Sequence, residues 1–269
     1  MADTLVALDF PGRRAEAALS DLHLEDRGWD VLYPLSEPFS RAVDPSHYVT
    51  HLAERCEGRQ IRAVLAYCAA APLACALAVR LGGAESPLPT VLFDGDPGSG
   101  AEIRSTVRGI VRQLTGMPAE DFDGELGAAL TDEGLRDRPE RAMELLTERV
   151  IRLGADVFEE DGLDGDEAVA VATRVSGFYL DWIAYLVAAF RVLPLSPGAG
   201  SVTHVRSSDR SVSDDWIGAR SLDVRAVDCG RVELLADPRT RELVTDLLGS
   251  APGTPTGSPR IPSSTVELK

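Results

Sequence analysis

The sequence has no excess of positive charge and no apolar run long enough to cross a membrane. It carries 43 acidic residues against 27 lysines and arginines, which gives a net charge of -16 at pH 7. A surface this acidic argues against nucleic acid and anionic membranes as partners. The first residues, MADTLVALDF, lack the basic region and apolar run of a signal peptide, so we expect a cytoplasmic protein.

Cysteine is scarce, and this excludes a disulfide framework. The four cysteines are Cys56, Cys68, Cys75 and Cys229, and no C-x-x-C pair occurs among them. We therefore expect reduced thiols. His47 and His51 are spaced i, i+4 on an expected helix, but no third ligand lies nearby, which favours surface histidines over a zinc site. The sequence predicts no bound metal and no bound cofactor.

Short apolar runs alternate with amphipathic stretches along most of the chain. The strand-like runs are 4–9, 29–35, 61–66, 89–93, 201–206 and 222–227. Between 98 and 197 the spacing is helical instead (103–114, 140–153 and 167–193), with turn-rich segments such as DEGLRDRP between the helices. This pattern predicts an α/β domain over 1–249, with a mostly parallel sheet, helices on both faces and a helical insertion. The tail, 250–269, has the composition of a flexible segment.

The stretch Ile61 to Leu81, IRAVLAYCAAAPLACALAVRL, combines a strand, a tight turn and an apolar helix. Its turn reads Ala66-Tyr67-Cys68-Ala69-Ala70. In α/β-hydrolases a G-x-S-x-G turn lifts the nucleophile onto a sharp strand-to-helix corner, where the next backbone N–H faces the oxyanion. Alanines are small enough to preserve that corner. The pattern favours Cys68 as nucleophile and Ala69 as an oxyanion donor; the alternative is a buried structural thiol.

From Ala66 to Leu81, AYCAAAPLACALAVRL resembles, without a gap, the elbow GHSFGGLVAYELARRL of thioesterases that release acyl chains from polyketide synthases and nonribosomal peptide synthetases. The resemblance implies an α/β-hydrolase fold in which residues 98–197 form a lid over an acyl channel. It also implies an acyl or peptidyl thioester presented on the phosphopantetheine arm of a carrier protein. An acidic carrier would need a local basic patch on this chain. Candidates for that patch are Arg13, Arg14, Arg59 and Arg62.

The resembled family places its other catalytic groups on three loops. A loop written F-P-x-x-G-G supplies the second oxyanion N–H, and its start matches Phe10-Pro11-Gly12, which makes Gly12 the candidate donor. The triad acid matches Asp94 in the multidomain synthases, within one residue of spacing, and Asp209 in some stand-alone enzymes. The general base of the family's G-D-H-F-x-x-L segment falls on Arg231, and arginine does not give up its proton at working pH.

Aromatic side chains gather on the last predicted lid helix and beside the elbow. The candidates for substrate binding are Tyr67, Phe178, Tyr179, Trp182 and Tyr185. An aromatic-rich core helix is the alternative interpretation of the lid residues. Asp94 could equally begin a turn in its D-G-D-P-G sequence, and His204 in the middle of a strand is more typical of a core histidine than of a base.

Cysteine and arginine together support a chemistry that either replacement alone would not. A thiol needs no general base when a guanidinium and a helix N-terminus favour its thiolate. No residue is placed to deprotonate water, so the sequence favours acyl transfer or cyclising release through a Cys68 acyl-enzyme over hydrolysis. Two alternatives stay open: a catalytically inactive thioesterase-like protein that binds an acyl chain or a carrier protein, and a non-acyl-transfer cyclase that uses the same pocket.

Overall fold

A six-stranded sheet forms the centre of the molecule. The computed structural model describes residues 3–10, 18–35, 40–116, 124–192, 199–210 and 213–249. The strands are β1 (Asp3–Leu8), β2 (Asp30–Leu32), β3 (Gln60–Tyr67), β4 (Thr90–Phe93), β5 (Ala199–Ser207) and β6 (Ala219–Val227). They lie in the order β2-β1-β3-β4-β5-β6, and each neighbouring pair is parallel. The chain steps outward from β1 to β2 and then returns to β3, so the topological switch point lies between β1 and β3, where α/β sheets form their ligand crevice.

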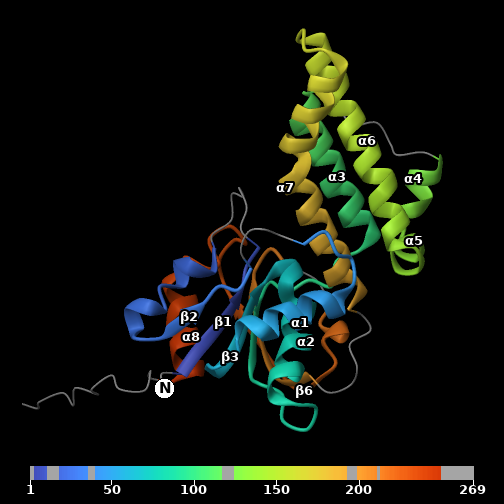
Figure 1. Cartoon of the computed structure of the whole chain (residues 1–269). Helices are drawn as coiled ribbons and strands as arrows, with labels where there is room; N and C mark the ends of the chain where they lie inside the picture. Colours follow the sequence, from blue (N-terminus) through green and yellow to red (C-terminus); the bar gives the residue numbers. More distant parts are fainter. Residues whose placement is uncertain are drawn as a thin grey trace, which may run out of the picture.

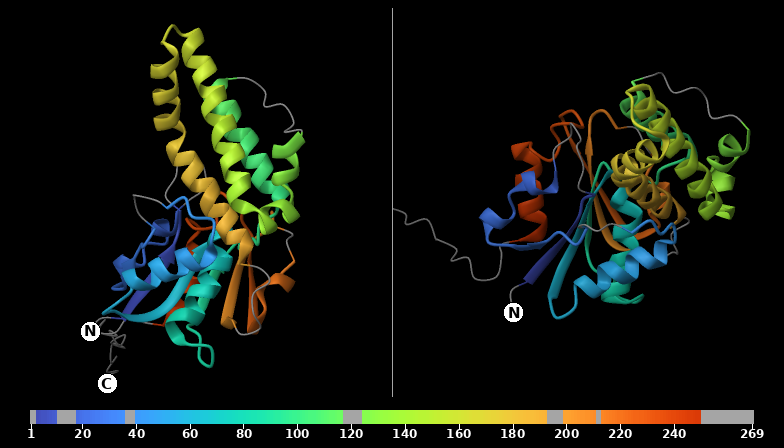
Figure 2. Two further views of the ribbon diagram at one scale, coloured as in Figure 1. Left: turned by 45° about the vertical axis from the view of Figure 1, so that its right-hand side comes forward. Right: turned by 45° about the horizontal axis from the view of Figure 1, so that its top comes forward.

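Helices cover both faces of the sheet because successive strand residues point to opposite sides. Val6, Val64 and their alternate neighbours pack against α1 (Pro45–Arg55) and α2 (Ala71–Gly82). Leu5, Leu65 and Val91 pack on the other face, under α8 (Pro238–Leu248) and the 3-10 turn η1 (Leu19–Leu22). The two further views in Figure 2 show α8 and the α1/α2 pair on opposite sides of the strands. The predicted parallel sheet with helices on both faces is thereby confirmed.

Five helices stand together beyond the ends of β3 and β4 (Figure 1). They are α3 (Gly100–Thr115), α4 (Gly124–Ala129), α5 (Asp132–Asp137), α6 (Pro139–Glu160) and α7 (Gly165–Arg191). We call them the lid helices. Within 100–192, apart from 117–123, the structure contains no strand. The DEGLRDRP segment, expected as a turn, contains α5 instead, because Thr131 caps it by accepting from the backbone N–H of Gly134.

Six strands lie where apolar runs predict them, and the observed ends differ from the predicted ones by at most three residues. The expectations for Gly12 as an oxyanion donor, for Arg13 and Arg14 as patch residues and for a flexible tail over 250–269 fall outside the described residues. None of the helices in the described ranges is long and apolar enough to cross a membrane.

Candidate active site

Cys68 occupies the corner between β3 and α2, as the elbow motif predicts. It begins the 3-10 turn η3 (Cys68–Ala70), which leads directly into α2. Its φ is 52°, in the left-handed region that costs a side-chain-bearing residue roughly 1 kcal/mol or more. The Cys68 carbonyl accepts from the backbone N–H groups of Ala71 and Asp96, which fix the corner from two sides. Ala69 follows it, and both residues line a cavity of about 1080 Å³.

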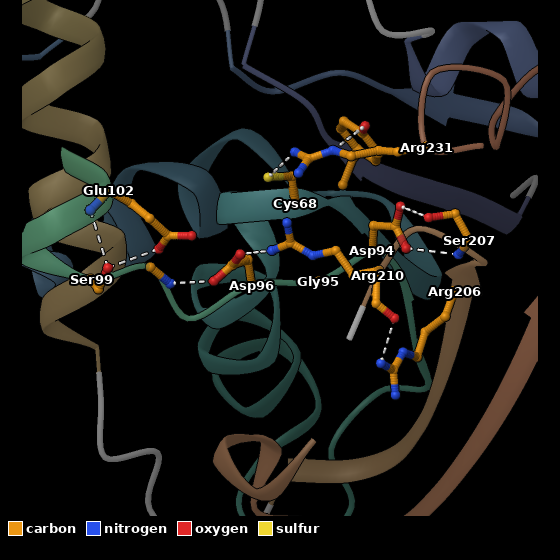
Figure 3. A network of polar contacts seen from close by, with 12 residues as sticks. Cys68, Asp94, Gly95, Asp96, Ser99, Glu102, Arg206, Ser207, Arg210 and Arg231 are labelled. Carbon is orange, nitrogen blue, oxygen red and sulfur yellow. Dashed lines mark hydrogen bonds and ion pairs between the residues drawn. The ribbon is translucent and has the colours of Figure 1, made fainter. Parts of the chain in front are cut away.

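Arg231 lies against the Cys68 thiol. Its Nη2 is 2.9 Å from Cys68 Sγ, and its Nε donates to the Tyr67 hydroxyl at 3.3 Å. The guanidinium carbon also lies 5.8 Å from the centroid of the Tyr67 ring. Figure 3 shows the guanidinium reaching over the elbow from the segment that follows β6. A permanent positive charge therefore occupies the position that the resemblance assigns to the general base.

A second arginine, Arg210, faces the same cavity and was missed by the sequence reading. It forms an ion pair with Asp96, and both side chains are mostly buried, at 12% and 9% exposure. The Arg206 guanidinium donates a hydrogen bond to the Arg210 carbonyl at 2.9 Å, which holds the backbone of Arg210 in place. Burial, followed by the nearby charge of Arg231, lowers the pKa of Arg210. The elbow is therefore flanked by two guanidinium groups and one carboxylate (Figure 3).

The two aspartates proposed as the acid do not line the cavity. Asp94 is fully buried with a φ of 42°, and its two oxygens accept from the backbone N–H and hydroxyl of Ser207, at 2.8 and 2.7 Å. Asp209 is exposed and accepts from the backbone N–H of Arg231 at 2.9 Å, so it holds the arginine's main chain rather than its guanidinium. Asp96, two residues beyond Asp94, is the carboxylate that the structure brings to the cavity beside Cys68.

His204 is a structural histidine that anchors the Asp94–Asp96 loop. Its Nε2 accepts from the backbone N–H of Gly95 at 2.8 Å, so Nε2 carries no proton and Nδ1–H donates to Asp214 at 2.6 Å. Burial is the main cause that lowers the pKa of His204. All four histidines lie in the described part of the chain, and none of them lines the cavity. His47 and His51 stand exposed on α1, as expected of surface histidines.

A cavity of about 1080 Å³ extends from Cys68 between the lid helices α3 and α7. The aromatic residues singled out from the sequence all line it: Tyr67, Phe178, Tyr179, Trp182 and Tyr185. The opposite side of α7 packs into the lid's own core through Leu180, Ile183 and Val187. The helix is thus both a core helix and a cavity wall: aliphatic residues of one side lie in the lid core, and the aromatic residues singled out from the sequence line the cavity.

Of the remaining cysteines, Cys56 and Cys75 are buried, whereas Cys229 is partly exposed like Cys68. Burial raises the pKa of Cys75 to about 12 and also raises the pKa of Cys56. Burial, together with the charge of Asp237, raises the pKa of Cys229. Cys229 and Cys68 both pack at the edge of the core under α8. Among the described residues no group of three or more potential ligands is placed to hold a metal ion.

Two of the four arginines considered for a carrier-docking patch are described. Arg59 pairs with Asp30 at 3.0 Å, and Arg62 is exposed on β3. Arg13 and Arg14 fall outside the described ranges.

Comparison with known proteins identifies the fold of the chain. No protein-family model matches the chain, and no curated protein matches it significantly. Among solved structures it is similar to the Vlm2 thioesterase domain bound with a dodecadepsipeptide (15% identity, TM-score 0.47, covering 92% of this chain and 93% of that one). It is also similar to the RedJ thioesterase of the prodiginine pathway in Streptomyces coelicolor (16%, 0.45, 92% and 90%). A protein assigned as an epoxide hydrolase, from Pseudomonas aeruginosa, aligns with a TM-score of 0.50 (13%, 91% and 88%). This last likeness, with the parallel strand order and the elbow, shows that the chain has the α/β-hydrolase fold.

Proposed function

We propose that the protein is a thioesterase-like acyltransferase or cyclase that transfers the acyl or peptidyl group of a thioester substrate onto Cys68. The observation that carries this proposal is the 2.9 Å contact between Arg231 Nη2 and Cys68 Sγ, at a strained elbow beneath a cavity of about 1080 Å³. The contact is a hydrogen bond from a permanently charged donor to the sulfur atom that the proposal makes the nucleophile. The cavity exceeds the roughly 300–1,000 Å³ of common small-molecule sites, which suits a long acyl chain.

The first step exchanges one thioester for another. The Cys68 thiolate attacks the carbonyl carbon, a new S–C bond forms, and the C–S bond to pantetheine breaks. Pantetheine leaves as a thiolate and takes up a solvent proton, which replaces the proton that Cys68 gave to solvent on ionising. The backbone N–H of Ala69 is the proposed donor to the oxyanion in between. We expect the substrate to arrive on the phosphopantetheine arm of a carrier protein.

The second step needs a nucleophile better than water. Arg231 cannot accept a proton, and no histidine lines the cavity. Both lining carboxylates among the described residues are engaged, Asp96 with Arg210 and Glu102 with the Ser99 hydroxyl. In the described part of the site, water therefore lacks a free base beside Cys68. An amine or hydroxyl, on the same acyl chain or on a second substrate, attacks the acyl-Cys68 carbonyl, releases its proton to solvent and regenerates the thiolate. The result is a cyclised or transferred acyl group.

The same absence of a base favours a second candidate function, a binding protein that holds an acyl chain or a carrier protein without turnover. The two candidates differ in whether a covalent intermediate forms. Intact-mass measurement after incubation with an acyl-pantetheine thioester tests this directly. The enzyme requires an acyl adduct on wild type and on Cys75→Ala, and no adduct on Cys68→Ala. Subsequent loss of the adduct on adding a primary amine, faster than in buffer alone, identifies transfer. Tight binding without an adduct would leave the binding protein.

A further inference from the structure

One face of α3 forms a polar wall of the cavity. Glu102, Ser105, Thr106, Gly109 and Gln113 all line it, at the i, i+3, i+4, i+7 and i+11 positions that share a helix face, and Ile103 and Ile110 line it along one edge of that face. Val107 and Val111, on the opposite face, are buried in the lid core. The facing wall, on α7, is mainly apolar. Its lining residues are Val175, Phe178, Tyr179, Trp182, Tyr185, Leu186, Ala189 and Phe190.

Gly109 stands in the middle of this polar face, where helix stability alone disfavours glycine. A glycine inside a helix is less favourable than alanine by roughly 1 kcal/mol. Its φ is not positive, and a Cβ built there would meet no described atom within 4 Å outside the local helix backbone. Neither backbone conformation nor packing therefore demands glycine. What the missing side chain leaves is room in the cavity, halfway along α3.

The cleft between the two helices is long enough for an extended chain. Glu102 and Gln113 bound it along α3, and eleven helical steps of about 1.5 Å span about 16 Å. At about 3.3 Å per residue, that distance takes about five extended peptide units. Gln113, Val175 and Tyr179 also line a second cavity of about 210 Å³ between α3, α6 and α7. The far end of the cleft therefore adjoins a second cavity.

We propose that this cleft binds an extended peptidyl or hydroxylated acyl chain, its polar edge along α3 and its apolar side against α7, and that Gly109 lets the chain pass. The pairing of a hydroxyl and amide wall with an aromatic wall matches a ligand that carries hydrogen-bonding groups on one edge only. The proposal rests on the proposed function for the thioester at the Cys68 end. The length and polarity of the bound chain follow from the cleft itself.

Binding without chemistry tests the proposal separately from catalysis. The probes are pantetheine thioethers in which a methylene separates the sulfur from the acyl carbonyl, carrying an acetyl, a pentapeptidyl or a myristoyl chain. Trp182 lines the cleft, so quenching of its fluorescence reports binding, and Trp182→Phe gives the background from the other tryptophans. Gly109→Leu places a branched side chain across the cleft. The matched control is Arg112→Leu, an exposed position on the same helix that does not line the cavity.

We expect Gly109→Leu to weaken binding of the pentapeptidyl probe about tenfold or more, equivalent to about 1.4 kcal/mol, while binding of the acetyl probe stays within about twofold. Arg112→Leu should leave both unchanged. Thermal melting checks folding, and Gly109→Leu should melt at or above the wild-type temperature because leucine is the better helix former. Equal binding of the pentapeptidyl probe to wild type and Gly109→Leu would overturn the role of Gly109. Tighter binding of the myristoyl than of the pentapeptidyl probe would overturn the polar-edged ligand. If Gly109→Leu weakens binding of the pentapeptidyl probe alone, as expected, but no acyl adduct forms on Cys68, the proposed function is wrong and the cleft proposal stands.

Discussion

The guanidinium of Arg231 and the thiol of Cys68 are in direct contact, with Nη2 2.9 Å from Sγ. They lie 163 residues apart in the sequence, one after β3 and the other after β6. The contact places a permanent positive charge against the sulfur but supplies no group that can move a proton. The consequences can be measured through the reactivity of the thiol, the stability of the surrounding ion pairs and the pH dependence of folding.

Alkylation should single out Cys68 among the four thiols. Burial raises the pKa of Cys75 to about 12 and raises that of Cys56 and Cys229, so these three present little thiolate near neutral pH. With limiting iodoacetamide at pH 7, peptide mapping by mass spectrometry should place the first label on Cys68. Cys68→Ala should remove the fast phase and Cys229→Ala should keep it. A fast label on Cys229 in wild type would contradict the assignment.

Removing the guanidinium should slow that fast phase. Arg231→Met is expected to reduce the labelling rate of Cys68 at neutral pH by about tenfold, equivalent to about 1.4 kcal/mol. The labelling rate of Arg231→Lys should lie between those of wild type and Arg231→Met, because the ammonium keeps the charge without the planar fork. Tyr67→Phe removes the hydroxyl that accepts from Arg231 Nε and should cost about threefold, since the ring and the charge both stay. Unchanged rates in Arg231→Met would show that the contact does not activate the thiol.

The Arg210–Asp96 pair should behave as a coupled unit in stability measurements. Asp96→Ala leaves a mostly buried guanidinium without its carboxylate and close to Arg231, and should lower the free energy of unfolding by about 3 kcal/mol. The double variant Asp96→Ala/Arg210→Met removes the stranded charge and should recover most of the loss. Urea denaturation of the three proteins measures both steps. If the double variant is no more stable than the single one, the two residues are not coupled in this way.

Mild acid should loosen the loop that His204 holds. Its pKa lies below the usual 6.5, chiefly because of burial, which outweighs the opposing effect of Asp214. The unfolded chain therefore binds a proton more readily than the folded one, so this contribution to stability is complete above pH 6.5 and falls as the pH drops below it. A proton on Nε2 would also displace the Gly95 N–H. Thermal melts against pH should show a smaller loss below pH 6.5 in His204→Gln than in wild type, with His47→Gln as the exposed control. Identical pH profiles for His204→Gln and wild type would reject this role.

The chain's local pattern determined the architecture and the elbow. Each core strand is a short apolar run whose length and flanking turns identify it without reference to its neighbours, and the lid helices repeat their apolar residues at helical spacing. Cys68 was found because strand, turn and helix are adjacent in the sequence, so the corner is a local property. The family resemblance singles out Arg231 because it stands at the offset of the family's base before Leu234 and Leu235, two residues that are fully buried in the core under α8.

Tertiary structure alone decided which charges meet at Cys68. Asp96 and Arg210 occupy loops after β4 and β5, with all five lid helices between them in sequence. They are brought together because β4 and β5 pair in parallel and so end side by side. Loop charges carry no periodicity, and an aspartate in a D-G-D-P-G turn has the same local sequence whether it meets solvent or a buried guanidinium. Asp94 shows the same limit from the other direction: Ser207 accounts for both of its oxygens, and that partner is set by strand pairing rather than by neighbouring sequence.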